Sequence, residues 1–511
     1  MEKEKEFPQF TVYGMENRNK IMKSFIKSTI TALCVIFIAL AAFPISTYAK
    51  ETDTKMSGTI YPKGYYSNWE GVSNVSQFKD ENGNYCFASS SGKKVTIFTT
   101  VKGKVKKKLK LKMPYPIFGA VSCDQDGNYY VVSGRNNKTS NKKAETVFIS
   151  KYSKTGSLIT TVGDNGSFGV PEYYTNDFNT KEPFAAGNCD IAINGNFVAV
   201  NYARHMYSGH QSNTALIINR ITMQKQQLNK YYNSHSFAQR AIPYRDGFIL
   251  ASEGDAYNRA FSIAFTTPTE DSAEPVSEKK ERSTWYYYDS DIPVDGSSYQ
   301  TKEDASIYKR NTGETRVNSF DIFHFWLQKN ASSNMFIVNN NFAHMGGIAV
   351  SDINHVALVG TSAKALNKKA KNQKESLFIQ IFDPTKNLKY PDAYVLPSTR
   401  SGSSGLNGTE DVTDYGIRWL TNGKYTVANP QVVADHKGRF VILFEKYQGS
   451  YQGVYYTIID QTGATVKKIT RFSSSAKLNS CETPVCVGNT ILWTANSYYG
   501  SKIYNYQLKV K

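Results

Sequence analysis

Short apolar runs separated by tight polar turns recur along most of the chain, and they come in pairs. Seven such pairs lie between residues 71 and 497, and two of them read FGAVSCDQDGNYYVVSG (118–134) and NPQVVADHKGRFVILFEKY (429–447). Apolar and polar positions that alternate over about four to eight residues are typical of half-buried β-strands, and a Gly or Asn between two strands is typical of a hairpin turn. The turns are expected at Gly83, Gly127, Gly195, Gly247, Asn354, Gly438 and Gly488.

Further strands follow most hairpins, so the repeating unit is a four-stranded antiparallel sheet. ETVFISKYS (145–153) and GSLITTVG (156–163) follow the second hairpin, for example. Such sheets, repeated at loose intervals, predict an all-β fold: a β-propeller of about seven four-stranded blades, with six and eight blades as the alternatives. The last unit has only two clear strands, so a segment around Gly58–Trp69 is expected to complete it and close the ring.

Two polar segments interrupt this rhythm. Residues 266–318 predict a long insertion between blades 4 and 5, and the Gly/Ser-rich residues 397–414 predict a loop between blades 5 and 6. The propeller is therefore expected to span residues 73–511, with residues 50–72 as a linker and possible closing strand. No second globular domain is expected.

The N-terminus has the three parts of a secretory signal peptide. Lys23 and Lys27 precede an apolar run of 12 residues, Ala32–Phe43, and small residues lead up to Ala49. This run is shorter than the roughly 20 residues of a membrane-spanning helix, so cleavage after Ala49 is favoured over an anchor. Residues 1–49 are thus interpreted as a signal peptide that starts at Met22. The mature protein is expected to be secreted or held at the cell surface, without an integral membrane segment.

The chain is strongly basic, with a formal net charge of +18. Outside the cell, such a surface favours anionic partners: teichoic acids, acidic polysaccharides or a phospholipid surface. No nucleic-acid-binding motif occurs, and we expect a monomer. The densest charge is the run VKGKVKKKLKLK, with seven lysines within residues 102–112. We interpret it as the outer strand of blade 1, whose lysines prevent the exposed sheet edge from pairing with other chains. The alternative is that these lysines form a stripe that binds polyanions.

Five cysteines remain after cleavage, an odd number without regular spacing, which predicts free buried thiols and no disulfide framework. The motif Asp124-Gln-Asp126-Gly127-Asn128 resembles part of a calcium loop. Because similar Asp/Asn-Gly turns recur in other blades, a plain hairpin turn is favoured there.

The order of the strands in a blade determines on which side of the ring each turn lies. If strands A to D run outward from the centre, the B–C turns share one rim with the crossings from strand D to the next blade. We call this the B–C rim, and the opposite side the A–B rim. His355 and His436 fall on the A–B rim. Convergent polar side chains on or near the B–C rim form the candidate ligand-binding site: His205, His210, Gln211, His235, Arg240, Glu253, Asp255, Tyr257, Arg259 and His344.

Besides ligand binding without chemistry, three roles are open for these candidates. The imidazoles could ligate a divalent metal, or a His base could act beside Arg and Tyr, an arrangement similar in residue types to propeller-fold polysaccharide lyases. The third reading is that the polar groups only join loops through hydrogen bonds. No nucleophile elbow, phosphate-binding loop, dinucleotide fingerprint or HExxH motif occurs.

The segments NSHSFAQR, GDAY and LNSCETPVCVGNTILWTAN resemble those of uncharacterised secreted β-propeller proteins of Gram-positive, clostridia-like bacteria. The resemblance implies a secreted or surface-exposed propeller. The leading hypothesis is a protein that binds an extracellular glycan or anionic cell-wall polymer on the B–C rim. A polysaccharide lyase or hydrolase, and a platform for protein interactions, are the alternatives.

Overall fold

Every regular element in the part of the chain described by the computed structural model is a β-strand. The described residues are 54–55, 75–166, 179–185, 187–228, 233, 235–254, 260–268, 314–324, 343–363, 374–382, 394–395, 417–496 and 502–511. Within them there is no helix of the length and hydrophobicity that crossing a membrane requires. The predicted signal peptide, residues 1–49, lies outside the described residues.

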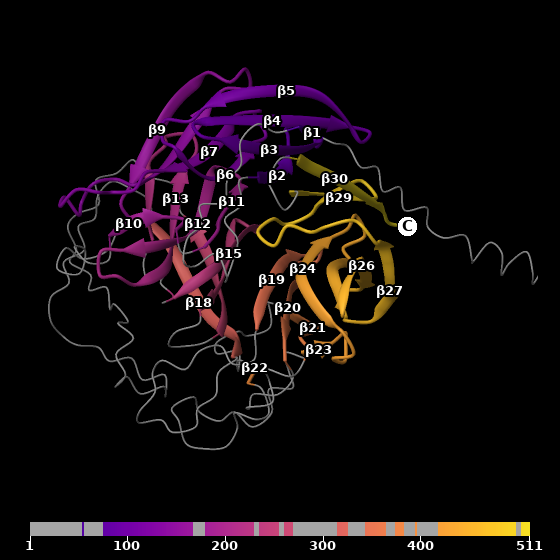
Figure 1. Ribbon diagram of the computed structural model, residues 1–511. Helices are drawn as coiled ribbons and strands as arrows, with labels where there is room; N and C mark the ends of the chain where they lie inside the picture. The colour runs from indigo at the N-terminus through magenta and orange to yellow at the C-terminus, as the bar shows by residue number, and fades with distance from the viewer. Residues whose placement is uncertain are drawn as a thin grey trace, which may run out of the picture. The chain divides into compact units, whose positions relative to one another are not determined.

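The strands form seven blades, which confirms the predicted β-propeller (Figure 1). Three blades are separate sheets of four consecutive strands. They are blade 1, with β2 (Val75–Lys79), β3 (Tyr85–Ser91), β4 (Lys94–Val101) and β5 (Lys104–Lys112); blade 2, with β6 (Ile117–Cys123), β7 (Tyr129–Gly134), β8 (Val147–Tyr152) and β9 (Leu158–Asp164); and blade 6, with β24 (Thr426–Ala434), β25 (Phe440–Gln448), β26 (Ser450–Ile459) and β27 (Thr465–Ser473).

Blades 3 and 4 are joined at their outer strands. Blade 3 has β11 (Cys189–Asn194), β12 (Phe197–Met206), β13 (Gln211–Asn219) and β14 (Lys225–Leu228); blade 4 has β15 (Ser236–Tyr244), β16 (Gly247–Gly254), β17 (Ala260–Pro268) and β18 (Glu314–His324). Strands β14 and β18 pair in parallel, which merges the two blades into one sheet. Two short strands extend this sheet, β10 (Thr180–Pro183) beside β12 and β22 (Tyr394–Val395) beside β18.

The two remaining blades draw strands from separated parts of the chain. Blade 5 has β19 (His344–Val350), β20 (Val356–Ser362), β21 (Ser376–Phe382) and β23 (Arg418–Trp419). Blade 7 has β28 (Val485–Val487), β29 (Thr490–Asn496), β30 (Lys502–Lys509) and, from the start of the chain, β1 (Thr54–Lys55). The closing strand therefore precedes the expected segment Gly58–Trp69, which lies outside the described residues.

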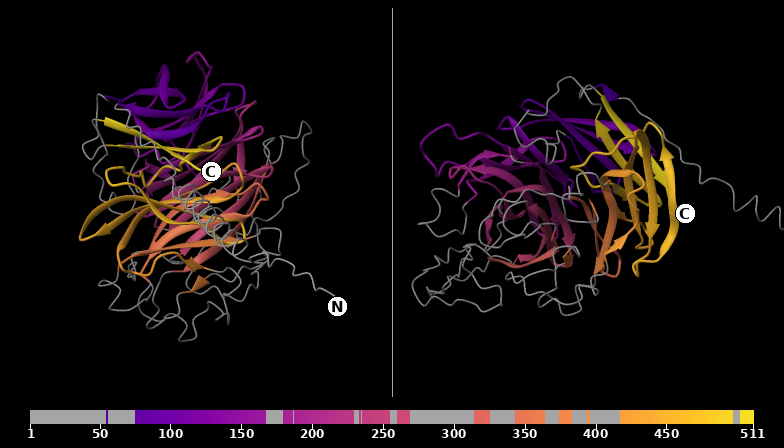
Figure 2. Two further views of the ribbon diagram at one scale, coloured as in Figure 1. Left: turned by 90° about the vertical axis from the view of Figure 1, so that its right-hand side faces the viewer. Right: turned by 60° about the horizontal axis from the view of Figure 1, so that its bottom comes forward.

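Seven apolar clusters fill the spaces between consecutive blades, because one face of each sheet packs against the next. The last cluster joins Val75, Phe87 and Phe98 of blade 1 to Ile503 and Leu492 of blade 7. The ring is thus closed by core packing as well as by β1. The last blade, in yellow, lies beside the first, in indigo, in both views of Figure 2.

Two predicted loop positions are wrong. The insertion expected over 266–318 lies inside blade 4, because β17 runs to Pro268 and pairs with β18 from Glu314 onward. The loop expected over 397–414 precedes β23, the fourth strand of blade 5, so it also lies inside a blade. Local pattern shows where a strand ends, but it does not show which later strand will pair with it. The residues between these strands lie outside the described part of the chain.

The hairpin turns were predicted well. Left-handed backbone conformations occur at six of the seven predicted turn residues, all but Gly247. In blade 4 the left-handed residue is Arg245, and Gly247 begins β16 so close to β17 that a Cβ would lie 1.8 Å from the carbonyl oxygen of Thr266. The fragment at Asp124 is also a hairpin turn: its Oδ1 accepts the N–H groups of Asp126 and Asn128 at 2.9 and 2.8 Å.

Candidate functional site

Two of the four candidate imidazoles lie together on the B–C rim. His210 ends the turn between β12 and β13, and His235 lies in the crossing that leads into β15. Their ring centroids are 5.8 Å apart, and the planes are inclined by 33°. His235 adopts a left-handed conformation (φ 49°), and its N–H donates to the carbonyl oxygen of Gln211 at 2.6 Å. Loss of hydration, and then the neighbouring His235, lower the pKa of His210, which favours a neutral imidazole at pH 7.

His205 has a different partner. Strand β10 pairs with the end of β12, which sets Glu182 opposite His205. The imidazole Nδ1 and the carboxylate Oε2 are 3.1 Å apart, and both side chains are partly exposed, 24% and 37%. A carboxylate that hydrogen-bonds to an imidazole fixes the orientation of the ring. This pair has the form of a general base with an orienting acid.

Other candidates have structural partners within the ring. Glu253 is 4% exposed, and its Oε2 accepts the N–H of Met345 at 2.7 Å. His344 is the first residue of β19, and burial lowers its pKa. The Gln211 side chain donates to the carbonyl oxygen of Gly209 at 3.2 Å. The candidates Asp255, Tyr257 and Arg259 lie outside the described residues.

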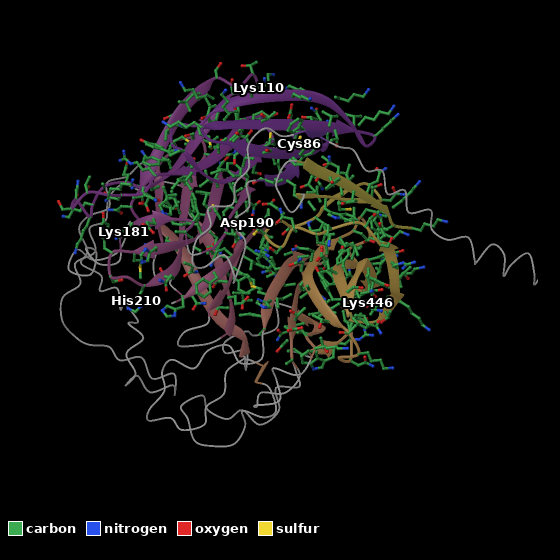
Figure 3. All side chains as sticks on the ribbon, viewed as in Figure 1. Cys86, Lys110, Lys181, Asp190, His210 and Lys446 are labelled. Atoms are coloured by element: carbon green, nitrogen blue, oxygen red, sulfur yellow. The ribbon has the colours of Figure 1, made fainter. Side chains whose placement is uncertain are left out.

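Arg240 lies five residues beyond His235 along β15, in the innermost strand of blade 4. It is fully buried, and its guanidinium donates to the carbonyl oxygens of Gln239 and Ser480. Arg240 therefore belongs to the centre of the ring and fastens the crossing into blade 7. Figure 3 places Asp190, near this centre, well apart from His210 toward the edge of the ring.

Two carboxyl groups near Arg240 were missed by the sequence reasoning. Burial raises the pKa of Asp190 to about 6, against the lowering effect of the Ala241 N–H and of Arg240. Burial, and then Asp190, raise the pKa of Glu482 well above its ordinary value. No sequence signal marks these groups, because Asp190 comes from β11 and Glu482 from the crossing between blades 6 and 7.

An aromatic and cationic surface next to the imidazoles was also missed. Tyr207 is in the same turn as His210, and its hydroxyl donates to the carbonyl oxygen of Thr139 in blade 2 at 3.2 Å. The Lys142 ammonium lies 5.9 Å from the centre of the Tyr207 ring. We call Lys142, Tyr207, His210 and His235 the rim patch.

The metal hypothesis finds no support in the described residues. Among them, no three His, Cys, Asp or Glu side chains are grouped so that they could hold a metal ion. The rim patch brings only two imidazoles together, and the neighbour of His205 is a single carboxylate.

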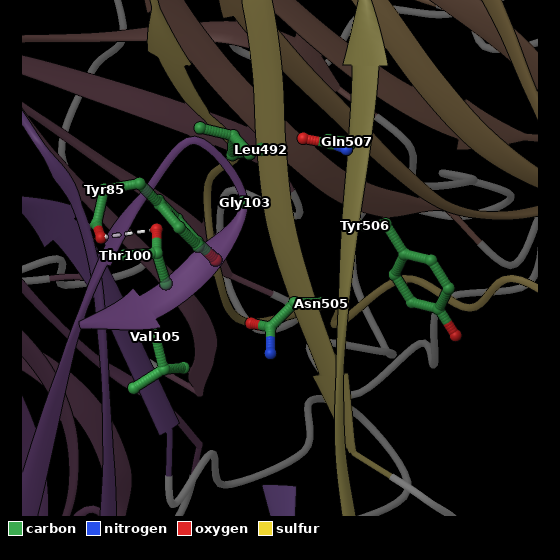
Figure 4. A pocket seen from close by; sticks show the side chains of 8 residues that line it. All are labelled: Tyr85, Thr100, Gly103, Val105, Leu492, Asn505, Tyr506 and Gln507. Carbon is green, nitrogen blue, oxygen red and sulfur yellow. Dashed lines mark hydrogen bonds between the residues drawn. The ribbon is translucent and has the colours of Figure 1, made fainter. Parts of the chain in front are cut away.

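A small recess lies on the opposite, A–B rim, between blades 7 and 1 (Figure 4). It encloses about 310 Å³, counting its open mouth. The Thr100 hydroxyl donates to the carbonyl oxygen of Tyr85 at 2.9 Å inside it. The recess is lined by Tyr85, Thr100, Gly103, Val105, Leu492, Asn505, Tyr506 and Gln507. It shares no residue with the candidate site.

Comparison with known proteins supports no family assignment. No protein-family model and no curated protein matches the chain. A chain of a mitotic checkpoint complex has a TM-score of 0.41 at 10% identity, covering 92% of this chain and 98% of its own length. The parainfluenza virus 5 hemagglutinin-neuraminidase ectodomain gives 0.38 at 8% identity, with 89% and 98% covered. A polysaccharide lyase, an ulvan lyase, gives 0.36 at 11% identity, with 73% and 76% covered. Likenesses as low as these carry no argument about what the chain binds.

Proposed function

We propose that this protein is a secreted β-propeller that binds an extracellular acidic glycan or anionic cell-wall polymer through its B–C rim. The observation that carries the proposal is the rim patch. Side chains from blade 2, blade 3 and the crossing into blade 4 place a cation, an aromatic ring and two imidazoles on adjacent loops.

The chemistry of the rim patch suits an acidic sugar. A lysine ammonium attracts a carboxylate or phosphate, and imidazole nitrogens form hydrogen bonds with hydroxyl groups. Aromatic faces pack against the apolar faces of sugar rings. The seven-bladed ring beneath holds these loops in place, which limits the entropy lost on binding.

Binding can be tested with an array of acidic and neutral glycans and cell-wall polymers. His210→Ala and Lys142→Ala are expected to weaken binding of the best ligand about tenfold, as truncations at a binding centre do. His436→Ala removes an exposed imidazole from the A–B rim and serves as the matched control. Equal binding by all three variants and the unmodified protein would remove the site from this rim.

An enzymatic role is the second candidate, and the His205–Glu182 pair is the observation that favours it. If His205 is a general base, incubation with acidic polysaccharides produces new chain ends, and His205→Ala abolishes them. A wide panel of polysaccharides that stays intact would eliminate this role. Secretion itself predicts that the protein is found outside the cell with residue 50 at its N-terminus, which N-terminal sequencing measures.

A further inference from the structure

The outer strand of blade 1 carries an unusual concentration of charge. Six of the nine residues of β5 are lysines, and all six are exposed. Val105, Leu109 and Leu111 point the other way and are partly or fully buried. Strand β5 pairs with β4 on one side, and among the described strands it has no partner on the other. Figure 3 shows Lys110 at this outer margin.

No acidic side chain from this part of the chain offsets the charge. Residues 82–123 contain nine lysines and neither Asp nor Glu. Lys94 lies opposite Lys112 in the sheet, and Lys102 continues the row in the turn before β5. None of the β5 lysines forms an ion pair with another described residue, and the Lys108 ammonium lies 5.5 Å from the centre of the Phe98 ring.

Protection of the sheet edge accounts for only part of this charge. Charged side chains, especially Lys, discourage an edge strand from pairing with another chain, but they serve this purpose alongside other devices such as Pro, bulges and short strands. Six exposed lysines repel one another, and a polyanion bound along the strand would relieve this repulsion beyond what salt screening does. The spacing also fits a linear partner, since alternate residues of a strand are about 7 Å apart and nine residues span about 30 Å.

We propose that β5 is a second binding surface, which takes a linear polyphosphodiester such as a polyol-phosphate polymer. The strand holds lysine alone and no arginine, so it presents strongly hydrated point charges without the planar geometry that selects carboxylates. Lysine also suits phosphate as a point charge. Because β5 lies on the outer edge of blade 1, this binding does not depend on the proposed function of the B–C rim.

The test compares three triple variants of the purified full chain. Lys106→Gln/Lys108→Gln/Lys110→Gln removes charge from β5. Lys106→Glu/Lys108→Glu/Lys110→Glu keeps the edge charged, and so protected, while repelling an anion. Lys467→Gln/Lys468→Gln/Arg471→Gln removes the same charge from β27, the outer strand of blade 6. Affinity for polyglycerol phosphate is measured at several salt concentrations.

Both β5 variants are expected to lose at least about tenfold in affinity. For the Gln variant, the slope of log affinity against log salt concentration should also become shallower by about two to three, since each lost lysine–phosphate contact lowers it by about one. The β27 variant should stay within twofold, and His210→Ala should not change this binding. Equal loss in the β27 variant would mean that only net charge matters, and would overturn the proposal. The proposal would also be overturned if the wild type bound polygalacturonate as tightly as polyglycerol phosphate. It would be overturned as well if the β5 variants lost affinity only for anionic phospholipid vesicles, which would identify a lipid surface as the partner.

Discussion

Gln77 joins the first blade to the last, and its replacement should weaken closure of the ring. Its Oε1 accepts the hydroxyl of Tyr85 at 2.9 Å and the N–H of Thr494 at 3.0 Å, and its Nε2 donates to the carbonyl oxygen of Thr483 at 2.8 Å. Tyr85 is 2% exposed and Thr494 is fully buried. The Gln77 N–H also donates to Glu482 Oε2 at 3.0 Å.

Gln77→Ala leaves the Tyr85 hydroxyl and the Thr494 N–H without their acceptor. A buried polar group that loses its partner costs about 1–3 kcal/mol, so the loss of two should lower the free energy of unfolding by about 2–6 kcal/mol. Urea denaturation followed by tryptophan fluorescence measures this loss, because Trp493 is buried next to Thr494. Gln452→Ala is the control, since the Gln452 amide bonds only to exposed groups of Ser450, and it should change stability by less than about 0.5 kcal/mol.

Gln77→Glu distinguishes the acceptor role of the side-chain amide from its donor role. It keeps the acceptor for Tyr85 and Thr494, loses the donor to Thr483, and adds a carboxyl group beside Glu482, whose pKa burial already raises. This variant should therefore be less stable than the wild type at pH 8 and recover toward it at pH 5, where the added carboxyl takes up a proton. A Gln77→Ala protein within about 0.5 kcal/mol of the wild type would show that the ring is closed by apolar packing and β1 without this side chain.

Three further predictions concern buried groups. The folded-state pKa of Asp190, about 6, lies above its unfolded value, so its contribution to stability is complete below about pH 4 and is lost as pH rises through 6. Over that range it amounts to up to about 3 kcal/mol, and the difference in unfolding free energy between the wild type and Asp190→Asn should change by this amount; a constant difference would contradict the shift. Burial raises the pKa of Cys86 to about 12, so this thiol should resist alkylation at pH 8 in the folded protein and react once the protein is unfolded, and rapid labelling of the native protein would refute its burial. Gly247→Ala should lower the melting temperature by several degrees because its Cβ meets the Thr266 carbonyl oxygen, whereas an unchanged value would show that β17 moves freely.

Much of the fold was predictable because its signals are local. Strand alternation, left-handed turn residues and a lysine-rich edge strand depend on neighbours within a few positions, and the structure has the predicted seven blades with the lysines of β5 exposed. The candidate site was harder to predict from the sequence. Sequence position assigned His210 and His235 to one rim, and their rings lie side by side, but nothing in the sequence linked His205 to Glu182, 23 residues earlier.

The sequence by itself determined which segments are strands, where they turn and which of their faces are apolar, since these follow from period-two patterning and from the conformational freedom of Gly and Asn. Only the tertiary structure decided which strands complete each blade. It placed β18 beside β17 after an insertion, β1 beside β30, and Gln77 beside Glu482 across 405 positions. The physical reason is that each of these contacts joins segments far apart in the chain, whose local sequences carry no information about one another; the β1–β30 and Gln77–Glu482 contacts form only when the ring closes.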